Sequence, residues 1–157
     1  RTESDAGAAR RYLEAFVANG GDDYQIDFML GEIIIQFPDW QRATPHFQRA
    51  LAKIAKLEKP TLEDLRLRAK GLYRLARFDD SVAAYDSLLR QHPRDRALRD
   101  EFYDVLVDMG RYDRARALLV EHRDAPALGK EGGRGGRAAA RHAAHRAAPA
   151  HRPPDVG

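Results

Sequence analysis

The sequence has 157 residues, of which 43% are hydrophobic and 32% are charged, a composition typical of a helical domain with a core of its own. It contains no cysteine, which excludes disulfides, thiol catalysis and cysteine-ligated metal sites, and no apolar run approaches the roughly 20 residues of a membrane helix. The net charge of +3 is uneven, because residues 129–157 carry six Lys or Arg against two acids and leave −1 for residues 1–128.

Apolar residues recur at helical spacing through most of the sequence. Leu65, Ala69 and Leu72, for example, fall on one face of a helix. Thr61, with Asp64 three residues later, is typical of a capping box that opens a helix. The pattern predicts seven helices, at about residues 6–19, 24–37, 40–57, 62–76, 79–91, 96–109 and 112–124.

The body of the sequence repeats itself. Residues 77–85 (RFDDSVAAY) and residues 111–119 (RYDRARALL) both begin Arg-aromatic-Asp, and they lie 34 residues apart. Residues 39–47 (DWQRATPHF) are a looser third copy. Each copy has an aromatic residue, then a small residue and then a large apolar residue: Trp40, Ala43 and Phe47; Phe78, Ser81 and Tyr85; Tyr112, Ala115 and Leu119.

These copies resemble the tetratricopeptide repeat (TPR) family, whose 34-residue unit has Leu-Gly-x-x-Tyr in its first helix and Ala-x-x-x-Phe in its second. Leu30 and Gly31 with Ile34, followed by Ala43 and Phe47, match this unit best. The resemblance implies an all-α, right-handed superhelical solenoid of antiparallel helix pairs. It also implies that the first helices line a concave face where peptides bind.

The aromatic residue that opens each copy is expected to anchor the turn within its helix pair. Trp40, Phe78 and Tyr112 would then be equivalent buried side chains. Truncation of a buried Trp40 would cost about 3–5 kcal/mol of folding free energy.

The repeat spacing divides the chain into three parts. Residues 24–128 are expected to form three TPR-like helix pairs, and residues 1–23 a half-repeat or capping helix. Because the repeat pattern begins with a second helix, halfway through a unit, we expect either a fragment or a protein whose first helix serves as a cap. Three residues of the first segment fit a second helix: Ala8, Tyr12 and Ala15.

Residues 129–157 are a low-complexity basic tail. Their one Val is the only large apolar side chain, so they cannot bury a core, and we expect them to be disordered. The composition changes abruptly near residue 129, and this change leads to the hypothesis that the end of the chain is frameshifted or artificial. His142 and His145 fall short of the three or four ligands of a zinc site. The basic tail would attract polyanions without sequence preference.

No catalytic set is recognisable, and the sequence predicts neither an enzyme nor a bound cofactor or metal. None of the three serines lies in a Gly-x-Ser-x-Gly elbow. The histidines of the body, His46, His92 and His122, are scattered and suit packing or solvated positions. The compartment stays open between cytoplasm and periplasm.

The first helix of each pair should present three side chains to a partner-binding groove. The first helices of the second and third pairs are in register at the 34-residue spacing, so their basic and acidic side chains should lie side by side. Either an ion-pair ladder fills the groove floor, or its charges rearrange to hold a charged peptide. We expect Arg66 to approach Asp100 and Lys70 to approach Asp104. The groove residues are Phe28, Glu32 and Gln36, then Arg66, Lys70 and Arg74, then Asp100, Asp104 and Asp108.

Three functions fit this sequence. The first is a non-enzymatic scaffold that binds a peptide or protein partner through the concave face. The second is a fragment of a larger bacterial envelope or export protein. The third is binding of a polyanion or nucleic acid through the basic tail, with no specific nucleic acid expected. Self-association through the C-terminal helix is a further expectation, because Leu118 and Leu119 have no following repeat to cover them.

Overall fold

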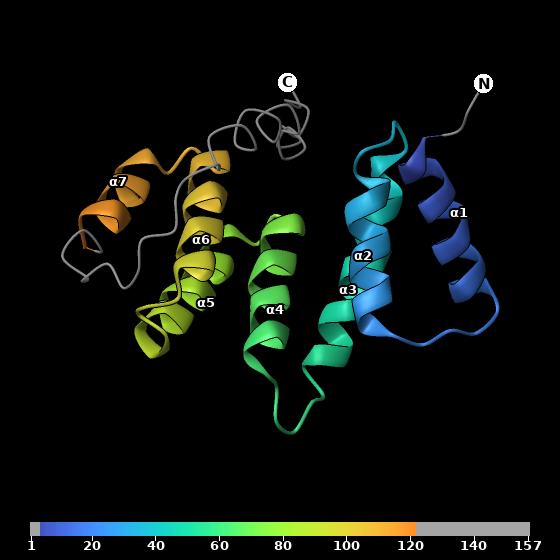
Figure 1. Ribbon diagram of the computed structural model, residues 1–157, viewed down its shortest axis with the longest axis horizontal. Coiled ribbons are helices and arrows are strands. Elements are labelled where there is room, and N and C mark those ends of the chain that lie inside the picture. Colours follow the sequence, from blue (N-terminus) through green and yellow to red (C-terminus); the bar gives the residue numbers. More distant parts are fainter. Residues whose placement is uncertain (1–3, 122–157) are drawn as a thin grey trace, which may run out of the picture. The chain divides into compact units, whose positions relative to one another are not determined.

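The computed structural model describes residues 4–121, which contain helices and no strand (Figure 1). This confirms the prediction of an all-α repeat fold with seven α-helices in this part of the chain. Two compact units, Arg1–Phe102 and Tyr103–Gly157, are described separately. The handedness of the solenoid and the properties of the basic tail therefore stay predictions. The elements are α1 (Asp5–Ala18), α2 (Tyr24–Ile34), η1 (Trp40–Ala43), α3 (Thr44–Ile54), α4 (Leu62–Arg74), α5 (Phe78–Gln91), α6 (Arg96–Asp108) and α7 (Tyr112–Glu121).

Local sequence accounts for where several helices begin. The predicted capping box is present at α4, where the backbone N–H of Asp64 donates to the Thr61 hydroxyl and the Asp64 carboxylate accepts from the Thr61 backbone N–H. The helix expected from residue 40 starts instead as the 3-10 turn η1, and α3 begins at Thr44. Pro45 lies in the first turn of α3, where its missing N–H costs no helical hydrogen bond.

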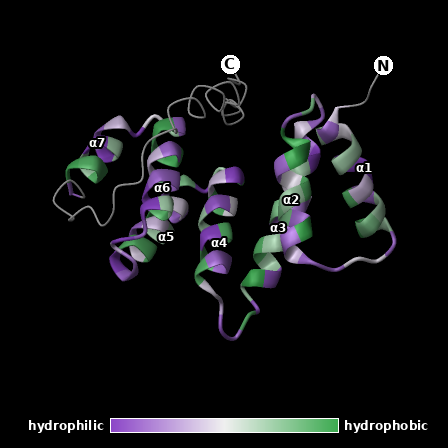
Figure 2. Cartoon of the chain, viewed as in Figure 1, coloured by the Kyte–Doolittle hydropathy of each residue, from purple (hydrophilic) through white to green (hydrophobic). Residues whose placement is uncertain are grey.

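Neighbouring helices pack pairwise in the first unit: α1 with α2, α2 with α3, α3 with α4, and α4 with α5. Each helix carries both hydrophobic and hydrophilic residues, as expected for helices with one buried face (Figure 2). Within α2 and α3, the Phe28 and Phe47 rings meet edge to face with centroids 5.2 Å apart. Gly31 allows this approach, because a Cβ there would lie 2.8 Å from the Phe47 ring.

The second pair also has a small residue at the contact between its helices, but its aromatic contact joins α5 to α6. Ser81 on α5 is fully buried, and its hydroxyl donates to the Ala69 carbonyl of α4 at 2.8 Å. Tyr85 on α5 stacks on Phe102 of α6 with ring centroids 5.0 Å apart. Small residues at the helix contact and aromatic rings beside it therefore recur along the first unit.

The three aromatic residues that open the repeat copies are not equivalent. Trp40 is 40% exposed, and Tyr112 is also exposed. Phe78 is half-buried, with its ring centroid 6.2 Å from that of Tyr73. The prediction that all three are buried anchors is therefore wrong for Trp40 and Tyr112, and the cost of truncating Trp40 is smaller than for a buried ring.

Polar contacts fix the ends of α2 against its neighbours. The Tyr24 hydroxyl, at the start of α2, donates to Asp64 Oδ1 of α4 at 2.6 Å. Beyond the end of α2, Asp39 accepts from Arg10 Nη1 of α1 at 2.8 Å and from Arg10 Nη2 at 2.5 Å. The guanidinium of Arg10 also lies over the Phe37 ring, 5.0 Å from its centroid.

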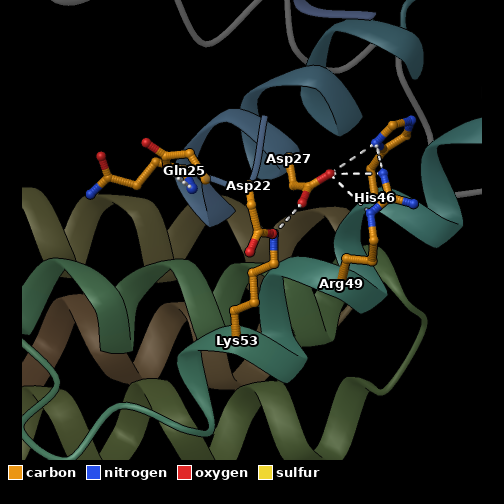
Figure 3. A network of polar contacts seen from close by, with 7 residues as sticks. Asp22, Gln25, Asp27, His46, Arg49 and Lys53 are labelled. Carbon is orange, nitrogen blue, oxygen red and sulfur yellow. Dashed lines mark hydrogen bonds and ion pairs between the residues drawn. The ribbon is translucent and has the colours of Figure 1, made fainter. Parts of the chain in front are cut away.

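A buried carboxylate ties α2 to α3. Asp27 points toward three basic side chains of α3 (Figure 3). Its Oδ1 accepts from Arg49 Nη2 at 2.8 Å, and its Oδ2 accepts from Lys53 Nζ at 3.1 Å. Lys53 also pairs with Asp22. His46 Nδ1 lies 3.3 Å from Asp27 Oδ1 and 2.6 Å from Arg49 Nη2.

The protonation states in this cluster follow from the contacts. Burial opposes ionisation of Asp27, but hydrogen bonds from Arg49, Lys53 and His46 outweigh it and hold the pKa of Asp27 below its ordinary value. Burial lowers the pKa of His46 below its ordinary value, although the contact with Asp27 acts in the opposite direction. The cluster is a structural ion pair rather than an acid–base site.

We predict that Phe47→Ala destabilises the fold far more than Trp40→Ala. Phe47 is fully buried against Phe28 and Gly31, so its truncation should cost about 3–5 kcal/mol. Trp40→Ala should cost about 1–2 kcal/mol, because much of the ring is already in water. Denaturant unfolding measures both values. Equal losses for the two variants would contradict the assignment of Phe47 as the anchor.

We also predict that Asp27→Asn destabilises the fold by about 2 kcal/mol at neutral pH, because it leaves three basic groups of α3 facing a neutral amide. The folded pKa of Asp27 is lowered, so its contribution is present above the unfolded value of 3.8 and is lost as pH falls through the folded pKa. Unfolding measured from pH 7 to pH 2 should show the two proteins converging in acid. A constant difference at every pH would contradict the role of the charge.

Candidate functional site

The basic residues of α4 face an acid on α2. Glu32 Oε1 accepts from Arg74 Nε at 2.6 Å, and Glu32 Oε2 accepts from Arg74 Nη2 at 3.1 Å. Lys70 Nζ lies 3.2 Å from Glu32 Oε2. The Arg74 guanidinium also lies over the Tyr73 ring, 5.3 Å from its centroid. Glu32, Lys70 and Arg74 are half-buried, so they form one charge-balanced patch at the surface between α2 and α4.

The third basic residue of α4 binds an acid on α6. Arg66 Nη2 donates to Glu101 Oε2 at 2.9 Å, and Arg66 Nη1 donates to Glu63 at 3.3 Å. The other oxygen of Glu101 accepts from the Tyr85 hydroxyl at 2.7 Å. Asp100, which was predicted to meet Arg66, is exposed and pairs within its own helix, 3.8 Å from Arg96 and 3.6 Å from Arg99. The expected Arg66–Asp100 pair is therefore replaced by Arg66–Glu101.

On α2, the exposed residue is one position away from the residue predicted to line the groove. Phe28 is only 4% exposed and belongs to the core, whereas Met29 beside it is 51% exposed. Glu32 lies on the same face of the helix as Met29, and Gln36 follows just after the end of α2. The Gln36 amide donates to the Glu32 backbone carbonyl at 3.2 Å.

Two of the predicted groove residues belong to the second unit. Asp104 and Asp108 are exposed and follow Asp100 at four-residue spacing along α6. The predicted Lys70–Asp104 pair joins residues of two separately described units, and it stays a prediction.

The electrostatics of the patch favour ionised side chains. Burial opposes ionisation of Glu32, but Arg74 and Lys70 outweigh it and hold the pKa of Glu32 below its ordinary value. Burial and the charge of Glu101 raise the pKa of Tyr85, so its phenol stays protonated and remains a donor to Glu101. At neutral pH the patch therefore consists of compensated charges, with no group poised to exchange a proton.

The described residues offer no assembled chemistry beside this patch. Within residues 4–121, no three histidine or acidic side chains come together in a way that could hold a metal ion. His92 is exposed, His46 belongs to the Asp27 cluster, and His122 lies outside the described residues, as do His142 and His145. This surface presents charged groups together with the exposed thioether of Met29.

Sequence reasoning missed Glu101 and Met29 because the repeat spacing gives the phase of the helices only to about one residue. The sequence feature that could have identified Glu101 is its place next to Phe102. Because Phe102 stacks on Tyr85, the Glu101 carboxylate accepts hydrogen bonds from both Arg66 and the Tyr85 hydroxyl. The sequence feature that could have identified Met29 is the large apolar ring of Phe28 beside it. Phe28 packs edge to face on Phe47 of the same repeat, which leaves the neighbouring Met29 on the exposed face.

Comparison with known proteins identifies the repeat. Residues 2–57 match the family model of the tetratricopeptide repeat. No curated protein and no solved structure matches the chain significantly. None of the helices in residues 4–121 combines the length and the apolar character of a membrane span.

Repeats of this family generally mediate protein–protein interaction, and they typically form scaffolds rather than enzymes. The match covers α1, α2 and α3, and in the next helix pair Ser81 of α5 bonds the backbone of the small residue Ala69 on α4. Residues 2–57 are therefore similar to the tetratricopeptide repeat family, and the described helices are consistent with a TPR-like helical solenoid.

Proposed function

We propose that this protein is a non-enzymatic scaffold that binds a peptide or protein segment on the exposed face of its first helices. In the first unit this face carries Met29 and Glu32 on α2, Gln36 just after the end of α2, and Arg66, Lys70 and Arg74 on α4. The observation that carries the proposal is the half-buried Glu32–Lys70–Arg74 patch beside the exposed Met29. Asp100 on α6 belongs to the same unit, whereas Asp104 and Asp108 lie in the second unit, where their part in partner binding stays a prediction.

The compensated charges indicate what kind of ligand fits. The three bases of α4 face Glu32, Glu63 and Glu101, so the surface has no excess of positive charge to hold a polyanion. Partly exposed ion pairs contribute only about 0–1 kcal/mol each, so a ligand can exchange them at small cost. A peptide with an apolar side chain for Met29 and a polar or charged group for Lys70 matches this surface.

The two alternative functions concern parts of the protein beyond the described residues. Polyanion binding would depend on residues 129–157, which lie outside them. Origin from a larger bacterial envelope or export protein would add further domains to the same repeats. Both are compatible with a binding role for the first unit, and the tail can be tested in the same experiment.

We predict that Lys70→Met and Met29→Asp each reduce capture of the protein partner. Purified full-length chain on beads would be incubated with an extract and crosslinked, and the captured proteins measured by quantitative mass spectrometry. A partner that uses this face should be depleted by at least about fivefold, which corresponds to roughly 1 kcal/mol. Arg68→Met is the matched control, because Arg68 is exposed on the same helix but away from the patch.

A partner that is retained by both patch variants would contradict the proposed face. Loss of all captured partners both on deletion of residues 129–157 and on nuclease treatment of the intact chain would favour polyanion binding by the tail instead. Loss with Arg68→Met to the same extent as with Lys70→Met would indicate a nonspecific effect of charge and would also count against the proposal.

We also propose self-association through α7. Leu118 is 1% exposed, which corrects the expectation that it lacks a cover, but Leu119 is 49% exposed and is followed by the exposed Val120. Adjacent apolar side chains at the surface of a helix favour contact with a second copy.

We predict that the protein forms a concentration-dependent dimer and that Leu119→Ser with Val120→Ser makes it monomeric, as measured by sedimentation equilibrium. Met29→Ser is the control, because Met29 is similarly exposed on another helix. A wild-type protein that stays monomeric at all concentrations, or a dimer that survives the double substitution, would contradict self-association through α7.

A further inference from the structure

The only asparagine of the chain lies at the end of α1 and is followed by a glycine. Asn19 is the C-cap residue of α1, and Gly20 and Gly21 begin the connection to α2. Asn19 and Gly20 are both exposed. The side-chain amide of Asn19 takes no part in the proposed binding face, which lies on other helices, so its chemistry is a separate question.

The end of α1 is a Schellman motif. The Gly20 N–H donates to the Val17 carbonyl at 3.1 Å, and the Gly21 N–H donates to the Phe16 carbonyl at 2.9 Å. Gly20 has the left-handed backbone that this motif requires, with φ of 85°. The Phe16 ring packs on Gly21, where a Cβ would lie 2.2 Å from it. Two backbone hydrogen bonds and one ring contact therefore hold this turn closed.

Two other helices end in the same way but with a different residue at the cap. Ala76 after α4 and Gly110 after α6 are also left-handed, with φ of 58° and 74°. The N–H of each donates to the carbonyl three residues before it, at 2.9 Å. The residues before them are Leu75 and Met109, which carry no amide. Of these three helix ends, that of α1 alone places a side-chain amide next to the left-handed residue.

We propose that Asn19 is a site of spontaneous deamidation, at a rate set by how often the end of α1 opens. The backbone nitrogen of Gly20 attacks the side-chain carbonyl carbon of Asn19 and forms a bond to it. The bond from this carbon to the side-chain nitrogen breaks, and that nitrogen takes up the Gly20 N–H proton and leaves as ammonia. Water then opens the cyclic imide at its side-chain carbonyl to give aspartate, or at its backbone carbonyl to give isoaspartate.

Glycine suits this reaction because no Cβ shields the attacking nitrogen. The folded turn restrains it, because Asn19 has ψ of 16° and the Gly20 N–H is directed to the Val17 carbonyl. Attack requires rotation about the Asn19 backbone, which breaks this hydrogen bond. Helix ends open more readily than helix interiors, and the packing of Phe16 on Gly21 opposes the opening.

The product places a charge where the helix disfavours it. A carboxylate at residue 19 meets the negative end of the α1 dipole. It also adds to the charge of Asp22, which pairs with Lys53 of α3, and of Asp23, which caps α2. Isoaspartate adds a backbone carbon as well, which shifts the register of the two hydrogen bonds of the turn. Deamidation therefore loosens the junction between α1 and α2.

The test follows Asn19 in purified full-length protein incubated under native conditions. Trypsin releases it in the peptide between Arg11 and Arg42, and mass spectrometry measures conversion of amide to acid. We expect conversion to proceed with time and to speed up as pH rises, because a deprotonated nitrogen attacks faster. Phe16→Ala should speed it at least about fivefold by freeing the turn. Tyr12→Ala is the matched control, because Tyr12 is an aromatic residue of the same helix that is 73% exposed.

Gly20→Ala tests the attacking nitrogen. Ala76 shows that this protein accepts alanine in the same turn, so the variant should keep its helices by circular dichroism and deamidate severalfold more slowly than the wild type. An intact Asn19 in the native protein after a time in which the urea-unfolded chain converts fully would overturn the proposal. Equal rates for Phe16→Ala and Tyr12→Ala, or a wild-type rate in Gly20→Ala, would overturn it as well.

Discussion

The close approach of the two helices in each pair is the constraint on which the rest of the first unit depends. At Gly31 there is no room for a Cβ beside the Phe47 ring, and at Ala69 the backbone carbonyl is near enough to accept from Ser81. Larger residues at these positions would separate the helices and uncover the aromatic rings between them. Because each pair contacts only its neighbours, the stability of so short an array depends on every one of these contacts.

This packing also determines which charges meet at the surface. First helices lie close enough for α2 and α4 to share the Glu32 cluster, and for α4 to reach Glu101 on α6. The basic residues of α4, which are Arg66, Lys70 and Arg74, therefore form ion pairs with acids on α6 and on α2. Such pairs contribute little free energy individually, and their main effect is to define the surface potential and to disfavour other registers of the helices.

Sequence reasoning recovered the helices, the capping box and the repeat, because these follow from local periodicity and spacing. Its errors in the site have one form: Phe28 was chosen for Met29 and Asp100 for Glu101, in each case one residue away. One residue is about 100° of rotation on a helix. Spacing fixes how helices repeat along the chain, whereas their rotation is fixed by side-chain packing, such as the Phe28–Phe47 and Tyr85–Phe102 contacts.

As a result of this rotation, the two acids that pair with the basic residues of α4, Glu101 and Glu32, are held in different ways. Glu101 is held by Arg66 and also by the hydroxyl of Tyr85, which is buried and stacked on Phe102, so this acid is fixed to the core. The carboxylate of Glu32 is held by the basic side chains of Lys70 and Arg74, with Arg74 supplying two of its bonds. Moving Glu101 would disturb a buried hydrogen bond, whereas Lys70 can leave Glu32 while Arg74 still holds it. For the proposed binding face, this difference predicts that a ligand would exchange contacts at Lys70 more readily than at Arg66.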